Sequence, residues 1–188
     1  MLYRMNGDGT GIRQLSFGEA NEWDPSVLPD GRIIYTRWDY INRNDVIFQS
    51  LWTMHPDGTG TAHYYGNYTR NPCMTAEARA IPGTDRVVST AMAHHGLTAG
   101  SLIEIDTSKG EDGEEPITRL TPEVAFPETE EPKGAGAYQT PWPLGDGFYL
   151  AAYSGSETAA YDRHFKPNDF GIVLLDPLGG RTEIYRDE

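Results

Sequence analysis

An internal repeat is the feature that most constrains how this chain can fold. An Asp-Gly-Thr-Gly run occupies Asp8–Gly11 and returns at Asp57–Gly60, and Leu2 returns as Leu51, so the matched positions lie 49 residues apart. A fixed period of this size is typical of propellers and solenoids, in which each unit packs its faces on its neighbours. The sequence therefore predicts a repeat architecture.

Two turn signals define the strands inside one repeat. Asp30-Gly31 and Asp57-Gly58 each follow a proline and adjoin a short apolar run. Asp-Gly pairs favour tight reversals because glycine adopts positive φ freely. The runs Ile33–Thr36 and Leu51–Met54 are apolar, aromatic or β-branched and too short for a stable helix. Each unit is therefore predicted to be a four-stranded sheet made of two hairpins.

The predicted fold class is all-β: a partial β-propeller of about three and a half four-stranded antiparallel blades. No segment predicts a convincing helix, and Met74–Ala80 is the best candidate for one helical turn. A closed propeller typically has four to eight blades, so the chain is expected to belong to a larger ring. The expected units of this single domain span residues 1–18 (an outer hairpin only), 23–68, 71–122 and 138–187, with an inter-unit loop at 123–137.

The net charge of the chain and the length of its apolar runs argue against two classes of function, nucleic-acid binding and membrane spanning. The chain of 188 residues has a net charge of −13, which repels phosphate backbones and argues against nucleic-acid binding. The acidic stretches Glu111–Glu115 and Glu123–Glu131 are expected to be solvated loops, with a cation site as the alternative. No run approaches the length of a membrane span. The expected partners are another protein or the remaining blades of the propeller.

The cysteine content excludes two kinds of covalent chemistry within this chain. Cys73 is the single cysteine, so no internal disulfide can form. A covalently attached c-type haem requires Cys-x-x-Cys-His, which is absent. No cofactor is therefore expected, with zinc as the alternative considered below.

The repeats resemble those of TolB-type β-propellers, in which Pro-Asp-Gly precedes an inner strand and Asp-Gly-Thr/Ser-Gly links the outer pair. Pro29–Gly31, Asp8–Gly11 and Asp57–Gly60 carry this resemblance. It implies a WD-like propeller fold and says little about activity, because such folds serve many functions.

A narrower resemblance covers most of the chain. The runs Ile34–Tyr40, Ser89–Gly96 and Gly100–Asp106 look like the propeller-bearing middle domain of hydrazine synthase alpha subunits and their relatives. This resemblance implies an exported bacterial protein, in the periplasm or at the cell surface. The synthase reaction takes place at c-type haems, and the missing attachment motif prevents that chemistry from being transferred to this chain.

One candidate site combines potential metal ligands. Cys73, His94, His95 and Asp39 all fall near the inner hairpins of successive units, where the axial channel of a propeller lies. A thiolate, an imidazole and a carboxylate would suit zinc, although their spacing matches no zinc motif. The alternative is a buried thiol and two histidines that form hydrogen bonds at strand ends.

A second candidate site is the group Arg37, Trp38, Asp39 and Tyr40, directly after an inner strand. These residues could form a rim that binds a planar or anionic ligand by stacking and paired hydrogen bonds. The alternative is a clamp between blades, in which Arg37 meets an acidic partner and Trp38 fills the space between sheets.

A hydrolytic triad could in principle combine Ser89 or Ser101 with His94 and Asp106, although no Gly-x-Ser-x-Gly elbow is present. The sequence favours a non-catalytic scaffold or binding module of an exported bacterial propeller protein. The alternative is the propeller portion of a metal- or haem-dependent oxidoreductase related to the hydrazine synthase alpha subunit, with the cofactor bound partly by flanking sequence.

Overall fold

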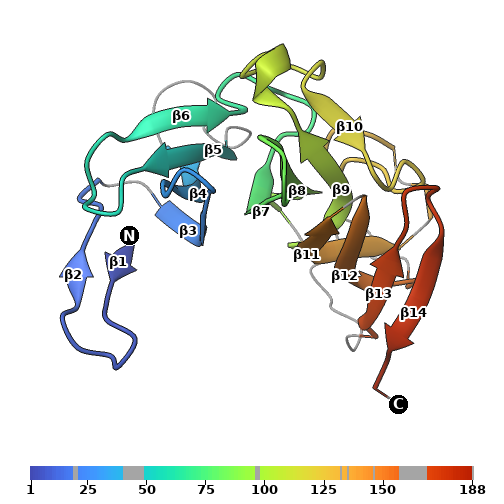
Figure 1. Cartoon of the computed structure of the whole chain (residues 1–188). Coiled ribbons are helices and arrows are strands. Elements are labelled where there is room, and N and C mark those ends of the chain that lie inside the picture. Colours follow the sequence, from blue (N-terminus) through green and yellow to red (C-terminus); the bar gives the residue numbers. More distant parts are fainter. Residues whose placement is uncertain are drawn as a thin grey trace.

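The computed structural model describes residues 1–18, 21–39, 49–95, 98–131, 133–134, 136–145, 147–156 and 169–187. The strands follow one another around a horseshoe-shaped arc, with the first hairpin at one end and the last strand at the other (Figure 1). In chain order they are β1 (Tyr3–Arg4), β2 (Arg13–Gln14), β3 (Asn21–Val27), β4 (Ile33–Trp38), β5 (Gln49–Met54), β6 (Ala62–Tyr65), β7 (Thr75–Ala80), β8 (Val87–Met92), β9 (Gly100–Ile105), β10 (Ile117–Arg119), β11 (Ala137–Gly145), β12 (Phe148–Ser154), β13 (Gly171–Leu175) and β14 (Arg181–Tyr185).

The sheets confirm an all-β, partial-propeller architecture. β1–β2 form a hairpin, β3-β4-β5-β6 form the second blade, and every strand pair within them is antiparallel. The third blade (β7–β10) and the fourth blade (β11–β14) are joined by one pairing, Tyr138 with Gly100. Met74–Ala80, the best candidate for a helical turn in the sequence, is not helical, because Thr75–Ala80 forms β7 and pairs with β8.

Helical structure in the described ranges is confined to a 3₁₀ turn, η2 (Thr107–Lys109). No helix among these residues is long and apolar enough to span a bilayer.

The Asp-Gly-Thr signature acts through local hydrogen bonds in the turn. Asp57 Oδ1 accepts hydrogen bonds from the Thr59 backbone N–H at 2.9 Å and from Thr59 Oγ1 at 2.7 Å. Gly58 has φ of +88°, and a Cβ there would lie 2.5 Å from the Leu15 carbonyl oxygen. Glycine is therefore required both by the turn and by the neighbouring hairpin.

The cores lie between successive blades. Ile34 and Leu51 of the second blade join Ile103 and Ile105 of the third blade in one buried cluster. The next cluster joins Leu102 to side chains of the fourth blade, which include Tyr138, Tyr149 and Val173. All residues of β8 and β9 are buried because their sheet is covered on both faces, whereas every residue of β14 is exposed.

The innermost strand of each blade carries the same irregularity. β3, β7 and β11 each contain a register shift, and Asp24, Glu77 and Thr140 at these shifts have φ of 52°, 59° and 55°. Such conformations are uncommon for residues other than glycine, so a bulge recurs at matched places. The Glu77 carboxylate accepts hydrogen bonds from the Thr140 backbone N–H at 2.6 Å and from Thr90 Oγ1 at 2.8 Å. This carboxylate therefore links the third blade to the fourth.

Candidate functional site

Aromatic side chains from two blades meet where β4 and β8 end. The Trp38 and His94 rings lie 4.8 Å apart between centroids, and the His94 and His95 rings lie 4.4 Å apart. The buried side-chain amide of Gln49, the first residue of β5, forms a hydrogen bond with Nδ1 of His94. His94 is therefore held between Trp38 and Gln49 of the second blade.

The Glu128 carboxylate holds the two histidines that follow β8 through hydrogen bonds. Its Oε2 accepts the His94 backbone N–H at 2.5 Å, and its Oε1 accepts the His95 backbone N–H at 3.0 Å and contacts His95 Nδ1 at 2.8 Å. Cys73 Sγ lies 3.7 Å from Oε2 of the same carboxylate. The expectation that Glu123–Glu131 is a solvated loop is therefore wrong for Glu128, whose side chain is largely buried.

These contacts set the protonation states at neutral pH. Burial, followed by the charge of Glu128, raises the pKa of the Cys73 thiol to about 12. Burial and the neighbouring His95 lower the pKa of His94. Burial alone would raise the pKa of Glu128, but hydrogen bonds from His94 and His95 hold it below its ordinary value. At pH 7 the thiol and His94 are neutral and Glu128 is charged.

We expect the Cys73 thiol to be almost inert in the folded protein. Ellman's reagent at pH 8 should modify it at least about 100-fold more slowly than in denaturing urea, since thiolate is the reactive form and the native pKa disfavours it. Stopped-flow absorbance measures both rates. Comparable rates in the two solvents would show that Cys73 is neither buried nor held as the thiol.

The structure gathers Cys73, His94 and His95 around Glu128, but their polar atoms are engaged by other side chains of the protein. Cys73 and His95 contact Glu128, and Gln49 bonds the Nδ1 of His94. Among the described residues, no group of three or more histidine, cysteine, aspartate or glutamate side chains is arranged to hold a metal ion. Zinc binding by Cys73, His94 and His95 stays a prediction.

The predicted rim Arg37–Tyr40 begins inside β4, and the side chains of Arg37 and Trp38 lie on opposite faces of the sheet. Arg37 Nε donates to Asp39 Oδ1 at 2.6 Å, and its guanidinium lies 4.7 Å from the Trp52 ring centroid. Trp38 instead meets His94, as expected for adjacent strand residues on opposite faces. Burial alone would lower the pKa of Arg37, but the hydrogen bond and charge of Asp39 raise it. Tyr40 lies outside the described residues.

The hydrolytic triad does not assemble. Met92 pairs with Gly100 and Val87 pairs with Ile105, so His94 and Asp106 follow β8 and β9 at opposite ends of this strand pair. Ser89 Oγ donates to the Ala76 carbonyl at 2.7 Å. Ser101 Oγ similarly donates to the Thr121 carbonyl at 3.0 Å.

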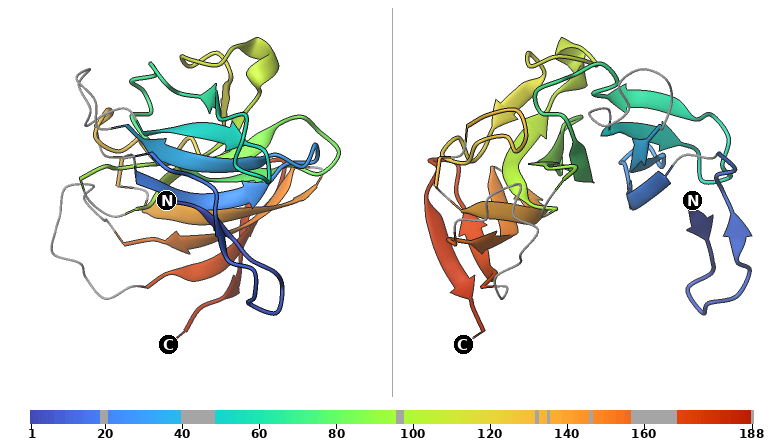
Figure 2. Two further views of the ribbon diagram at one scale, coloured as in Figure 1. Left: turned by 90° about the vertical axis from the view of Figure 1, so that its left-hand side faces the viewer. Right: turned by 180° about the vertical axis from the view of Figure 1, so that it is seen from behind.

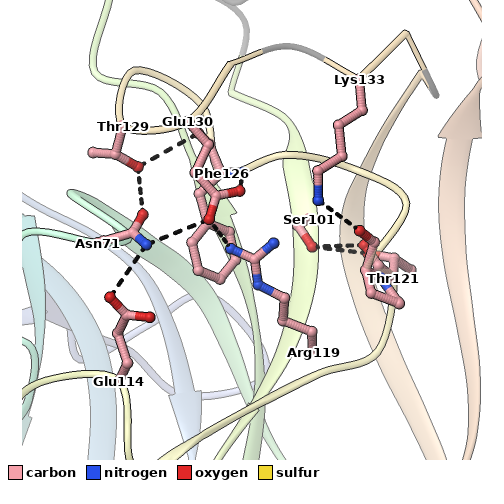
Figure 3. A network of polar contacts seen from close by, with 10 residues as sticks. Asn71, Ser101, Glu114, Arg119, Thr121, Phe126, Thr129, Glu130 and Lys133 are labelled. Atoms are coloured by element: carbon pink, nitrogen blue, oxygen red, sulfur yellow. Dashed lines mark hydrogen bonds and ion pairs between the residues drawn. The ribbon is translucent and has the colours of Figure 1, made fainter.

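The rest of the acidic loop is fixed by a second carboxylate (Figure 3). Glu130 accepts hydrogen bonds from Arg119, from Asn71 Nδ2 at 3.4 Å and from the Phe126 backbone N–H at 2.9 Å. The Arg119 guanidinium lies 3.5 Å from the Phe126 ring centroid. Thr129 Oγ1 donates to Asn71 Oδ1 at 2.6 Å. The loop therefore packs on the third blade and positions Glu128 against the backbone of His94 and His95.

A pocket of about 370 Å³ opens beside His94, between the second and third blades. One of its residues is Glu22, which is only 8% exposed and whose Oε2 is buried without a hydrogen-bond partner. Sequence reasoning identified Trp38 and His94 but missed Glu22, because nothing local to β3 reveals which carboxylate will be buried. The pocket is lined by Met1, Asn21, Glu22, Trp23, Trp38, Gln49, Met74, Ala93, His94 and Thr98.

Comparison with family models and with curated proteins finds no match. Among solved structures, the chain is similar to Kuenenia stuttgartiensis hydrazine synthase, with a TM-score of 0.68 and 19% identity over 94% of this chain and 21% of that chain. It is also similar to a putative gluconolactonase, with a TM-score of 0.51 and 14% identity over 94% of this chain and 52% of that one. The chain thus spans about a fifth and about half of these proteins. At these identities the likeness shows the fold alone, which is that of a β-propeller.

Proposed function

We propose that this chain is a non-catalytic scaffold and binding segment of a β-propeller, and that the fourth blade binds a further blade through its uncovered face. The observation that carries the proposal is the composition of that face. Ile172 and Tyr185 are 45% and 58% exposed. We call these two residues, with the half-buried Leu150 and Leu174, the outer apolar face.

The strand register makes the outer apolar face continuous. Leu150 pairs with Leu174, and Ile172, two residues before Leu174 on the same strand, pairs with Tyr185. Side chains that are paired across strands lie on the same side of a sheet. The opposite side of the fourth blade is buried against the third blade. A sheet with one solvated face normally carries polar residues there, so two apolar faces indicate a blade that is covered on both sides.

A further propeller blade is the occupant that fits this face. The second and third blades already pack apolar faces on each other in the same manner. The arc is open on the side between β1–β2 and β14 (Figure 2). Both structural neighbours extend well beyond the part that this chain matches. These observations support a blade as the partner over an unrelated protein.

The mass of the chain in solution tests this proposal. We expect light scattering after size exclusion to give a mass above the 20.9 kDa of the monomer, because a second copy covers the outer apolar face when no blade does. The double variant Ile172→Glu/Tyr185→Glu should shift the mass towards 20.9 kDa while the circular dichroism stays that of a β protein. The control variant Thr118→Glu, at an exposed position of β10, should associate like the wild type.

A monodisperse wild-type monomer at tens of micromolar would contradict the proposal.

The proposal also includes export of the protein to the periplasm or cell surface, which the resemblance to TolB-type and hydrazine synthase alpha propellers supports. Fractionation of the native host would test this location. The oxidoreductase alternative would be favoured by near-stoichiometric zinc or iron in the purified chain that is lost in Cys73→Ser or His94→Ala.

A further inference from the structure

The recurring bulge of the innermost strands brings matched residues of three blades to one pocket. Ser26, Arg79 and Trp142 are the first paired residues after the register shifts of β3, β7 and β11. These strands lie on the inner side of the arc (Figure 1). Bulges re-aim side chains and are over-represented next to active sites. The pocket has a volume of about 410 Å³ and is lined by Ser26, Val27, Arg79, Ala80, Pro82, Trp142 and Pro143.

Arg79 brings a positive charge to this pocket, and among the described residues it forms no ion pair. Its guanidinium donates a hydrogen bond to the Pro25 carbonyl at 3.4 Å, which leaves most of its N–H groups for another acceptor. The chain has 28 acidic and 15 basic residues, so carboxylates are abundant, and Arg86 pairs with one of them. Burial, followed by the charge of Glu77, raises the pKa of Asp24, and the charge of Arg79 opposes that rise. The field of Arg79 therefore reaches Asp24 although the two side chains form no ion pair in the described structure.

Trp142 supplies an apolar surface beside this charge. Its ring centroid lies 5.6 Å from Cζ of Arg79, and 56% of the residue is exposed. An exposed indole offers a face on which a flat ring can stack. The guanidinium fork binds planar carboxylates through paired hydrogen bonds. A flat carboxylate therefore meets one partner for its charge and another for its ring.

We propose that this pocket binds a small aromatic carboxylate, with Arg79 as its counter-ion and Trp142 as its stacking surface. A cation is disfavoured by the guanidinium. A phosphate ester is disfavoured because Asp24 and the net charge of −13 repel its second charge. The proposal goes beyond the blade-binding function and does not depend on it, because none of the described residues that line the pocket belongs to the outer apolar face.

Three probes separate the charge of the ligand from its ring. Benzoate has both, benzamide is neutral with nearly the same shape, and acetate lacks the ring. The chain has four tryptophans, so the indole N–H signal of Trp142 in a nuclear magnetic resonance spectrum is the one that Trp142→Phe removes. Benzoate at pH 7 should shift this signal, benzamide should bind at least about 10-fold more weakly, and acetate should also bind more weakly than benzoate. Equal affinities for benzoate and benzamide, or a Trp142 signal that benzoate leaves in place, would overturn the proposal.

Variants assign the binding to Arg79. Arg79→Gln removes the charge and should weaken benzoate at least about 10-fold. Arg79→Lys should restore only part of the affinity, because an ammonium group lacks the planar fork. Arg13→Gln makes the same charge change at an exposed position outside the pocket and should leave the affinity unchanged. Unchanged benzoate binding by Arg79→Gln, or an equal loss in Arg13→Gln, would contradict the role given to Arg79.

Melting temperatures distinguish a ligand site from a purely structural contact between blades. Arg79 touches the Pro25 carbonyl and the Trp142 ring, so Arg79→Gln can lower the melting temperature whether or not a ligand binds. Saturating benzoate should raise the melting temperature of the wild type and not that of Arg79→Gln or Trp142→Leu. A wild-type melting temperature that benzoate does not change would show that Arg79 and Trp142 serve the fold alone.

Discussion

Gly100→Ala is expected to lower the free energy of unfolding by more than about 3 kcal/mol. A Cβ at Gly100 would lie 2.0 Å from the Ala91 carbonyl oxygen and 3.0 Å from Cγ of Pro127. The backbone cannot move aside, because Gly100 pairs with Met92 in β8 and with Tyr138 in β11. The residue thus lies where the third and fourth blades share one hydrogen-bonded sheet.

Urea unfolding followed by circular dichroism measures this loss, with Gly7→Ala as the control. A Cβ at Gly7 meets no atom within 4 Å, so that variant should stay within about 0.5 kcal/mol of the wild type. Loss of less than about 1 kcal/mol in Gly100→Ala would mean that the two blades are not joined as tightly as described.

Glu128→Ala is the second substitution with a large expected effect, about 2–4 kcal/mol. It removes the acceptor for the backbone N–H groups of His94 and His95 and for the His95 ring. The alanine keeps the φ of 64° that Glu128 already has, so the loss reports the hydrogen bonds and not a change of backbone strain. Glu128→Gln keeps one acceptor oxygen and should lose less.

The control and the pH dependence make this second prediction specific. Glu131→Ala, at an exposed position in the same loop, should be nearly neutral. The pKa of Glu128 is lowered from 4.5, so its stabilisation is complete above pH 4.5 and is lost as pH falls through the lower folded pKa. The difference between wild type and Glu128→Ala should therefore close below pH 4.5. A constant difference from pH 7 to pH 3 would contradict this assignment.

His94 contributes to acid sensitivity in the same direction. Its pKa is lowered from 6.5, so the unfolded chain takes up a proton before the folded protein does, and stability falls as pH drops below 6.5. As pH falls, the loss of stability due to His94 begins at a higher pH than the loss due to Glu128. The His94 contribution should persist in Glu128→Ala.

The strands could be predicted because the signals that define them are local. Asp30-Gly31 and Asp57-Gly58 specify reversals through positive φ and Asp side-chain hydrogen bonds, and these operate within four residues. Met74–Ala80 is the best helical candidate in the sequence because most of its residues suit a helix by intrinsic propensity. Burial between two blades outweighs that propensity and makes the segment a strand.

The site was only partly predictable, because its geometry depends on contacts between distant segments. The adjacent histidines and Trp38 were singled out by residue type, and the structure does bring Trp38 to His94. Glu128 reaches His94 across 34 residues of sequence, and its acidic loop gave no sign of burial. The positive φ of Asp24 and Glu77 could not be predicted either, because neither residue is glycine.

In the part of the chain that the structure describes, the buried clusters join each blade to the next along the chain, so the arc is close to a one-dimensional array. In such arrays the loss of a unit destabilises its immediate neighbours most, because each unit is stabilised by its contacts with adjacent units. Units with a single neighbour therefore unfold locally before the others. The β1–β2 hairpin and the fourth blade have one neighbour each in this chain, whereas the fully buried strands β8 and β9 are covered on both sides. Amide exchange would therefore run inward from both ends, and closure of the ring by further blades would remove the ends from which it begins.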